Sequence, residues 1–247
     1  MIMEYDGSEY HGSQYQENAP TIQGEIESAL QKLTGERTRV SAASRTDAGV
    51  HARGQMVSFK TSLEFSPKTW VNALNSYLAR DITIRAAYRV SQDFDVRRDA
   101  WSREYRYCIW NRPTPSPLMR RFSHFVPQSL DIEAMNHACQ VLVGDHDFAP
   151  FAALYAGVTH RRVFKAEVVR DGDLVIFDME ANSFLPHQVR NTVGGLVRVG
   201  LAKMEVDTFR APARSGQPGT VGPTAPAHGL CLMKVNHRNF PPSFEET

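Results

Sequence analysis

The feature that most constrains the fold is an order of secondary-structure elements that occurs twice along the chain. Alternating apolar residues predict strands, and apolar residues three and four positions apart predict helices. In the first half the predicted order is strand, helix, strand, strand, helix, strand, at residues 2–5, 21–35, 40–43, 55–59, 66–78 and 82–88. This β-α-β-β-α-β order is the ferredoxin-like arrangement, an α+β fold. We therefore expect an N-terminal ferredoxin-like domain at residues 1–100.

The second half repeats the element order without repeating the sequence. The pattern predicts a strand, a helix, a hairpin, a helix and a closing strand, at residues 103–110, 130–144, 163–180, 189–200 and 230–235. Asp171-Gly172 is a typical turn for the hairpin. The pair Gly194-Gly195 weakens the second helix, so we expect close packing against a neighbouring segment there. Residues 101–247 are thus predicted to form a C-terminal ferredoxin-like domain.

The composition is that of an ordinary globular protein, with 42% hydrophobic and 22% charged residues in 247. The chain does not start with a basic segment followed by an apolar run, and no apolar stretch is long enough to span a bilayer. We therefore expect a cytoplasmic protein without a membrane partner. Cys108, Cys139 and Cys231 lie far apart, and the histidines show no metal-ligand spacing. We expect reduced, buried cysteines and no metal site.

Arginine is unevenly distributed along the chain, although the net charge is only +1. Seven arginines lie between positions 97 and 121, against Asp99 and Glu104. The planar guanidinium group suits contacts to phosphates and bases, and this favours an RNA-binding surface that includes Arg97 and Arg98. A solvated charged surface explains the same pattern, so charge alone leaves both interpretations open.

The segment Ser44–Ala52 is a polar loop between two predicted strands and contains one carboxylate, Asp47. Gly49 permits a tight turn there. With a reference pKa near 4, an aspartate is already ionised at neutral pH and needs no base to act as a nucleophile. Arg45 could direct the carboxylate through a charge-assisted pair. An aspartate in such a turn also commonly caps its own backbone, so the local pattern by itself leaves a structural role open.

Residues 45–51 read Arg-Thr-Asp-Ala-Gly-Val-His, and this heptapeptide resembles the signature of the A-type tRNA pseudouridine synthases. Further blocks resemble the same family in the same order, at Glu4–Gly7, Thr21–Gln23, Tyr105–Tyr107, Gly144–Phe148, Val189–Asn191 and Thr224–Leu230. The resemblance implies isomerisation of uridine to pseudouridine in the anticodon stem-loop of tRNA, at positions 38 to 40, by a homodimer. The isomerisation adds no group and changes no net redox state, so no cofactor is expected.

The resemblance also implies roles for individual residues. Asp47 corresponds to the nucleophile that acts on a flipped-out uridine, at C1′ of the ribose or C6 of the base. Tyr105 matches the active-site tyrosine, which could stack on the uracil, whereas Tyr107 is expected in the core. Arg190 matches a basic residue that could pair with Asp47, which implies a catalytic cleft between the two halves. His51 is expected to be a hydrogen-bonding residue of the loop or an RNA contact.

Two departures from the family pattern stand out. One is Pro186-His187-Gln188 before Arg190, where the family more commonly has basic and methionine residues, and the other lies in the loop before the first helix. Ser13 and Tyr15 stand where the family usually has a tryptophan and a basic residue. Two other functions compete with this interpretation, an RNA-binding module without catalysis and an aspartate-dependent glycoside hydrolase. The presence of all four expected catalytic residues argues against the first: Arg45, Asp47, Tyr105 and Arg190. A glycoside hydrolase needs a second carboxylate as acid, and none lies near Asp47 in the sequence.

Overall fold

The computed structural model describes residues 1–153, 156–212, 221–238 and 240, and its fold is α+β as predicted. The chain forms two compact units. The first contains Met1–Arg103 and the chain from Leu232 onward, and the second contains Glu104–Cys231. The sequence pattern had placed all of residues 101–247 in one domain. The alternation of the C-terminal strand predicts a strand but does not indicate which unit that strand joins.

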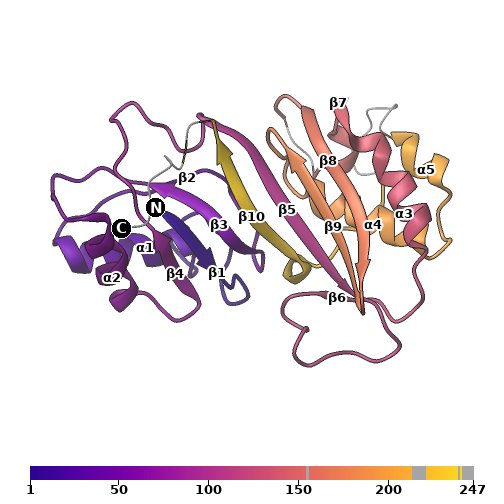
Figure 1. Ribbon diagram of the computed structural model, residues 1–247, viewed down its shortest axis with the longest axis horizontal. Helices are drawn as coiled ribbons and strands as arrows, with labels where there is room; N and C mark the ends of the chain where they lie inside the picture. The colour runs from indigo at the N-terminus through magenta and orange to yellow at the C-terminus, as the bar shows by residue number, and fades with distance from the viewer. Residues whose placement is uncertain (154–155, 213–220, 239, 241–247) are drawn as a thin grey trace. The chain divides into compact units, whose positions relative to one another are not determined.

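The first unit follows the predicted β-α-β-β-α-β order. Its elements are β1 (Ile2–Tyr5), α1 (Ile22–Thr34), β2 (Ser41–Ala42), β3 (His51–Ser58), α2 (Pro67–Tyr77) and β4 (Ile82–Ala86). Strand β1 pairs antiparallel with both β3 and β4, and β2 pairs antiparallel with β3. Helix α1 packs beside α2, and α2 packs against β4 (Figure 1).

The two helices of this unit end where their capping residues predicted. The Thr21 side chain accepts a hydrogen bond from the Gly24 N–H, and Gly35 ends α1 with a left-handed φ of 78°. Ser66 caps α2 in the same way, with Pro67 at the first helical position. These groups are satisfied locally, which is why the sequence alone located the helix ends.

Strand β3 is longer than its residue pattern indicated. The expected strand began at Gln55, whereas β3 begins at His51, directly after the Asp47 loop. Residues 51–54 do not alternate, and their conformation follows from pairing with β1 and from a close approach at Gly54. A Cβ atom at Gly54 would lie 2.4 Å from the Met233 carbonyl oxygen. The loop that contains Asp47 is therefore shorter than the sequence indicated.

The remaining elements also contain the predicted order, with additions. They are β5 (Ala100–Trp110), β6 (His124–Phe125), α3 (Ile132–Cys139), β7 (Gly144–Asp147), β8 (His160–Asp171), β9 (Leu174–Ala181), α4 (Gln188–Gly200), α5 (Val206–Arg210) and β10 (Leu230–His237). In the second unit the strands follow the order β5-β9-β8-β7, and in the first unit β10 follows β3. Helix α3 packs against β8 and beside α4 and α5 (Figure 1).

The expectation of one helix as far as Gly144 was wrong. Helix α3 ends at Cys139, and a 3₁₀ turn leads to Gly144, whose φ of 116° lets the chain reverse into β7. No apolar alternation marks β7, which exists because it pairs with β8, with Gly144 opposite Val163. The short elements β6 and α5 were not expected either.

Close packing at the glycine pair of α4 is confirmed. A Cβ atom at Gly194 would lie 1.7 Å from the Pro223 carbonyl oxygen, so the neighbouring segment passes directly over the helix.

The three cysteines are free, but only Cys139 is buried, and the other two are half-buried. None of the described helices is both long and apolar enough to cross a bilayer.

Candidate active site

Asp47 lies in a tight turn that connects β2 to β3. The Val50 N–H donates to the Asp47 carbonyl oxygen at 3.1 Å, and Gly49, at the third position of the turn, has a φ of 77°. A positive φ at this position is the mark of a type II turn, which explains the glycine. Asp47 is half-buried and Ala48 beside it is exposed. The turn therefore holds the carboxylate close to the surface.

The turn is anchored by the segment between β1 and α1. The Ser13 N–H donates to the Thr46 carbonyl oxygen at 3.0 Å, and the Thr46 N–H donates to Ser13 Oγ at 2.8 Å. The hydroxyl groups of Tyr5 and Thr46 lie 2.8 Å apart. The Gly49 N–H donates to the Tyr10 carbonyl oxygen at 3.3 Å. Residues on both sides of Asp47 are thus held by a segment far away in sequence.

A buried glutamine holds the start of the same loop. Gln55 Nε2 donates to the Ser44 carbonyl oxygen at 2.7 Å, and Gln55 Oε1 accepts from the Ser44 N–H at 3.2 Å. The Gln55 side chain makes the two hydrogen bonds that a neighbouring strand would otherwise make to Ser44. Buried backbone groups require such partners. The backbone at the start of the Asp47 loop is therefore held by hydrogen bonds from another part of the same chain.

Arg45 does not form the expected pair with Asp47. Ser44 and Thr46 are both fastened by their backbone groups, and the residue between them faces solvent. Across the described part of the chain, the Arg45 guanidinium has no hydrogen bond or ion pair. Arg45 is therefore exposed beside the Asp47 turn rather than oriented by it.

His51 is buried at the first position of β3, next to the turn. Its Nδ1 atom lies 3.1 Å from both the Gly7 nitrogen and Asp6 Oδ1. One nitrogen cannot accept from Gly7 and donate to Asp6 at once. The Gly7 N–H can only donate, so we assign Nδ1 as its acceptor, which leaves the approach to Asp6 Oδ1 as a contact without a shared hydrogen. His51 thus acts as a hydrogen-bonding residue of the loop.

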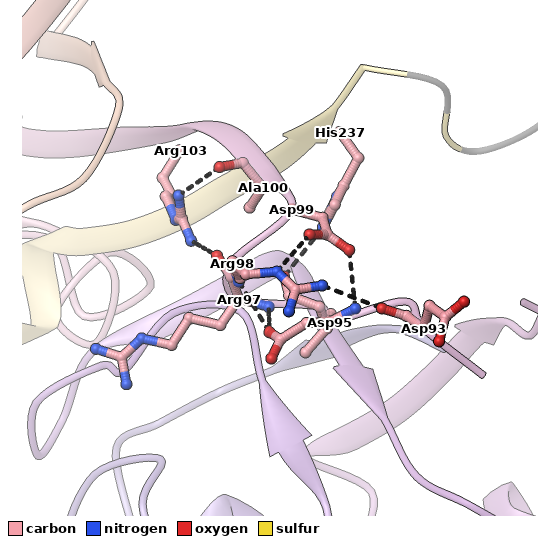
Figure 2. Close-up of polar contacts among 9 residues, drawn as sticks. Asp93, Asp95, Arg97, Arg98, Asp99, Ala100, Arg103 and His237 are labelled. Atoms are coloured by element: carbon pink, nitrogen blue, oxygen red, sulfur yellow. Dashed lines mark hydrogen bonds and ion pairs between the residues drawn. The ribbon is translucent and has the colours of Figure 1, made fainter. Parts of the chain in front are cut away.

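The expected RNA-contacting arginines lie in the loop before β5, which is arranged around two carboxylates (Figure 2). Asp95 accepts hydrogen bonds from the backbone N–H groups of Arg98 and Arg97, at 2.8 and 2.9 Å. Asp99 accepts from the Asp95 N–H at 2.9 Å. These hydrogen bonds hold the pKa of both carboxyl groups below the usual value, because they stabilise the charged form.

The two arginines of this loop have different partners. Arg98 Nε donates to Asp99 Oδ1 at 3.0 Å, and its Nη2 donates to the Asp93 carbonyl oxygen at 3.1 Å. The Arg97 guanidinium points away from these carboxylates (Figure 2) and has no hydrogen bond or ion pair with the described residues. Arg97 is therefore available to a phosphate, whereas Arg98 would first have to leave Asp99.

Arg103 belongs to the arginine-rich stretch in sequence but not to an RNA-binding surface. It is 7% exposed, and its guanidinium donates to the carbonyl oxygens of Ala43, Arg97 and Ala100, at 3.1, 2.8 and 3.1 Å. It therefore ties the chain before the Asp47 loop to the backbone of Arg97. No sequence signal separated this arginine from its exposed neighbours.

In the second unit, two tyrosines of β5 lie on its buried face, as their alternation predicted. Tyr105 is 6% exposed, and its ring meets Phe184 edge to face, with centroids 5.1 Å apart. Tyr107 is fully buried, and its hydroxyl donates to the Pro226 carbonyl oxygen at 2.8 Å. Burial raises the pKa of Tyr107, because a buried phenolate is poorly solvated. Tyr107 is a core residue.

Arg190 lies in the first turn of α4 and is half-buried. Its Nε–H donates to the Ala225 carbonyl oxygen at 2.8 Å, and the Ala225 N–H donates to the Arg190 carbonyl oxygen at 3.1 Å. The first hydrogen bond holds the guanidinium against the segment that precedes β10, and the second joins the backbone of Arg190 to the same segment. The side chain is therefore oriented rather than free to sample many rotamers.

Comparison with known proteins covers nearly the whole chain. A family model described as tRNA pseudouridine synthase matches residues 1–99 and 138–237. The chain is 45% identical over 240 residues to tRNA pseudouridine synthase A of Roseiflexus castenholzii, with 95% of this chain and 88% of that protein covered. It is 44% identical to proteins of the same name from a second Roseiflexus strain, over 240 residues, and from Moorella thermoacetica, over 241. These alignments cover 95% and 96% of this chain, and 88% and 98% of the relatives. The chain therefore belongs to the tRNA pseudouridine synthase family, a family of isomerases.

Proposed function

We propose that this chain isomerises uridine to pseudouridine in the anticodon stem-loop of tRNA, at positions 38 to 40, with Asp47 as the nucleophile. The observation that carries the proposal is the half-buried Asp47 on a turn whose two flanks are anchored. A nucleophile held in place before the substrate arrives avoids much of the entropic cost of alignment. On the basis of the family resemblance, we also propose that the protein acts as a homodimer in the cytoplasm.

The chemistry needs only groups that the protein and the RNA provide. The N1–C1′ bond breaks, the uracil turns, and C5 joins C1′. The hydrogen on C5 leaves as a proton, and N1 takes up a proton. Attack by Asp47 at C1′ displaces the base, whereas attack at C6 activates the ring, and both routes return the carboxylate at the end. We assign no cofactor to the reaction, because the product has the composition and oxidation level of the substrate.

Two residues of the second unit complete the proposed machinery. The target base must leave its stack, which costs on the order of a few kcal/mol, and stacking on an aromatic ring can offset about 1–3 kcal/mol. We assign this stacking to Tyr105, whose ring orientation is held by Phe184. We assign Arg190 as the cation that pairs with Asp47. Its anchoring on Ala225 supports this assignment, because an oriented guanidinium suits a carboxylate.

Release of the C5 hydrogen tests the proposed function directly. An anticodon stem-loop with tritium at C5 of its uridines should lose tritium to water when it is incubated with the purified protein. A hairpin from another arm of the same tRNA, labelled in the same way, is the control. Binding without release would favour an RNA-binding module, and equal release from both hairpins would contradict the assignment to the anticodon arm.

We expect Arg97 and Arg98 to contribute unequally to RNA binding. Each phosphate contact adds about 0.7 to 0.9 to the slope of log affinity against log salt concentration. Arg97→Gln should reduce the slope by about that amount, because its guanidinium has no partner among the described residues. Arg98→Gln should change the slope less, since Asp99 already pairs with Arg98. Stem-loop affinities measured from 50 to 300 mM salt provide the test, and equal slopes for both variants would contradict it.

A further inference from the structure

Ser13 connects the loop between β1 and α1 to the residue that precedes Asp47. Its side chain is buried, with 6% exposure. Ser13 Oγ accepts from the Thr46 N–H at 2.8 Å, while the Ser13 N–H donates to the Thr46 carbonyl oxygen at 3.0 Å. That carbonyl belongs to the peptide group that ends in the Asp47 nitrogen. The Ser13 backbone therefore holds the peptide group that leads into Asp47, and the Ser13 hydroxyl holds the adjacent peptide group between Arg45 and Thr46.

Ser13 is in turn held by the first turn of α1. The Gln23 N–H donates to the Ser13 carbonyl oxygen at 3.0 Å, and the Ile22 N–H donates to the Gly12 carbonyl oxygen at 3.3 Å. The first N–H groups of a helix have no partner within the helix, and here two carbonyl oxygens of the loop satisfy them. A continuous path of hydrogen bonds therefore leads from a rigid helix through Ser13 to the Asp47 turn.

Gly12 makes this arrangement possible. Its φ is 92°, and a Cβ atom there would lie 2.9 Å from the Thr46 carbonyl oxygen. Only glycine allows the two backbones to approach this closely. At that separation a short hydroxyl side chain at position 13 reaches the Thr46 N–H.

We propose that Ser13 is a positioning residue for the reaction, which acts by holding the Asp47 turn in its reactive orientation. This inference rests on the nucleophile role proposed for Asp47. Without the Ser13 hydroxyl, the buried Thr46 N–H loses the partner seen here, which favours rotation of the Arg45–Thr46 peptide toward another acceptor. This peptide is adjacent to the one that leads into Asp47, so its rotation changes the direction of the carboxylate. A displacement of about 1 Å at a reacting group can reduce a rate by about 100-fold.

The test compares Ser13→Ala with Ser13→Thr, which keeps a hydroxyl at the same place. The measurement is the single-turnover rate constant for tritium release, with enzyme in excess and the stem-loop saturated. Under these conditions the rate constant does not depend on how much of the variant is folded. Ser13→Ala should be slower by about 10- to 100-fold, with a dissociation constant for RNA within about threefold of wild type. Ser13→Thr should recover most of the rate.

Asn75 offers a matched control in the same unit. Its side chain also binds both backbone groups of one residue, accepting from the Ile84 N–H at 2.8 Å and donating to the Ile84 carbonyl oxygen at 2.9 Å. Asn75→Ala should lower the melting temperature and leave the single-turnover rate constant unchanged. If Asn75→Ala slows the reaction as much as Ser13→Ala, or if Ser13→Ala reacts at the wild-type rate, Ser13 has only a structural role.

Asp47→Ala in parallel separates this inference from the proposed function. Turnover by Asp47→Ala would remove the nucleophile assignment itself, whatever the Ser13 variants do. Loss of turnover in Asp47→Ala together with a wild-type rate in Ser13→Ala would overturn only the positioning role. An Asp47→Ala, Ser13→Ala double variant should be no slower than Asp47→Ala alone, because a turn without its carboxylate has nothing to orient.

Discussion

Asp47→Asn and Asp47→Ala are expected to abolish pseudouridine formation while the affinity for tRNA stays within a few fold of wild type. Loss of a nucleophile that acts with its supporting groups reduces turnover by about 10⁴-fold or more in well-studied enzymes. Asparagine has nearly the shape of aspartate, and the turn is held by backbone hydrogen bonds of its neighbours, so the loop should keep its structure. Single-turnover tritium release and filter binding measure the two quantities separately.

Asp93 provides the matched control for charge. It lies exposed in the same unit, and Arg98 contacts only its carbonyl oxygen. Asp93→Asn therefore removes one negative charge without removing a described side-chain contact, and it should react at the wild-type rate. Retained turnover in Asp47→Asn would eliminate the nucleophile assignment, and a large loss of RNA affinity would show that Asp47 contributes to binding.

Arg190→Ala is expected to have the second largest effect. In the proposed pair, loss of Arg190 leaves the Asp47 carboxylate without its cation. Breaking a buried ion pair costs about 3–5 kcal/mol, and we take the lower end because Arg190 is half-buried. About 3 kcal/mol corresponds to a rate lower by about 100-fold. Arg190→Lys should lie between alanine and wild type, since lysine keeps the charge but cannot reproduce the guanidinium plane that Ala225 anchors. Single-turnover rates at saturating stem-loop measure the effect.

The specificity of the Arg190 effect can be judged against Arg198. That arginine lies in the same helix and is exposed, so Arg198→Ala removes the same side chain without a catalytic role and should react like wild type. In a double-mutant cycle, Arg190→Ala should add little to Asp47→Ala if the two groups act together. Wild-type turnover by Arg190→Ala would show that the second unit does not provide the catalytic cation.

Local chemistry explains which parts of the fold were predictable from the sequence. Thr21 and Ser66 cap their helices with their own side chains, and Gly35 ends α1 in a conformation that other residues avoid. The element order of the first unit followed from these signals and from apolar alternation. Strand β7 and the start of β3 were not predictable, because their residues show no apolar alternation and become strands only by pairing with β8 and β1.

In the candidate site, too, some features follow from the local sequence and others only from the tertiary structure. From the sequence alone, Asp47 belongs to a glycine-containing turn, and the motifs around it indicate the family. Only the tertiary structure shows that Arg45 faces solvent and that Arg97, unlike Arg98, has no partner among the described residues. The hydrogen bonds that hold the site together join residues far apart in the sequence. Ser13 and Thr46 are separated by 33 positions, and Arg103 and Ala43 by 60. A sequence pattern extends over a few neighbours, whereas hydrogen bonds between distant backbones form only once the sheet and helices have brought them together.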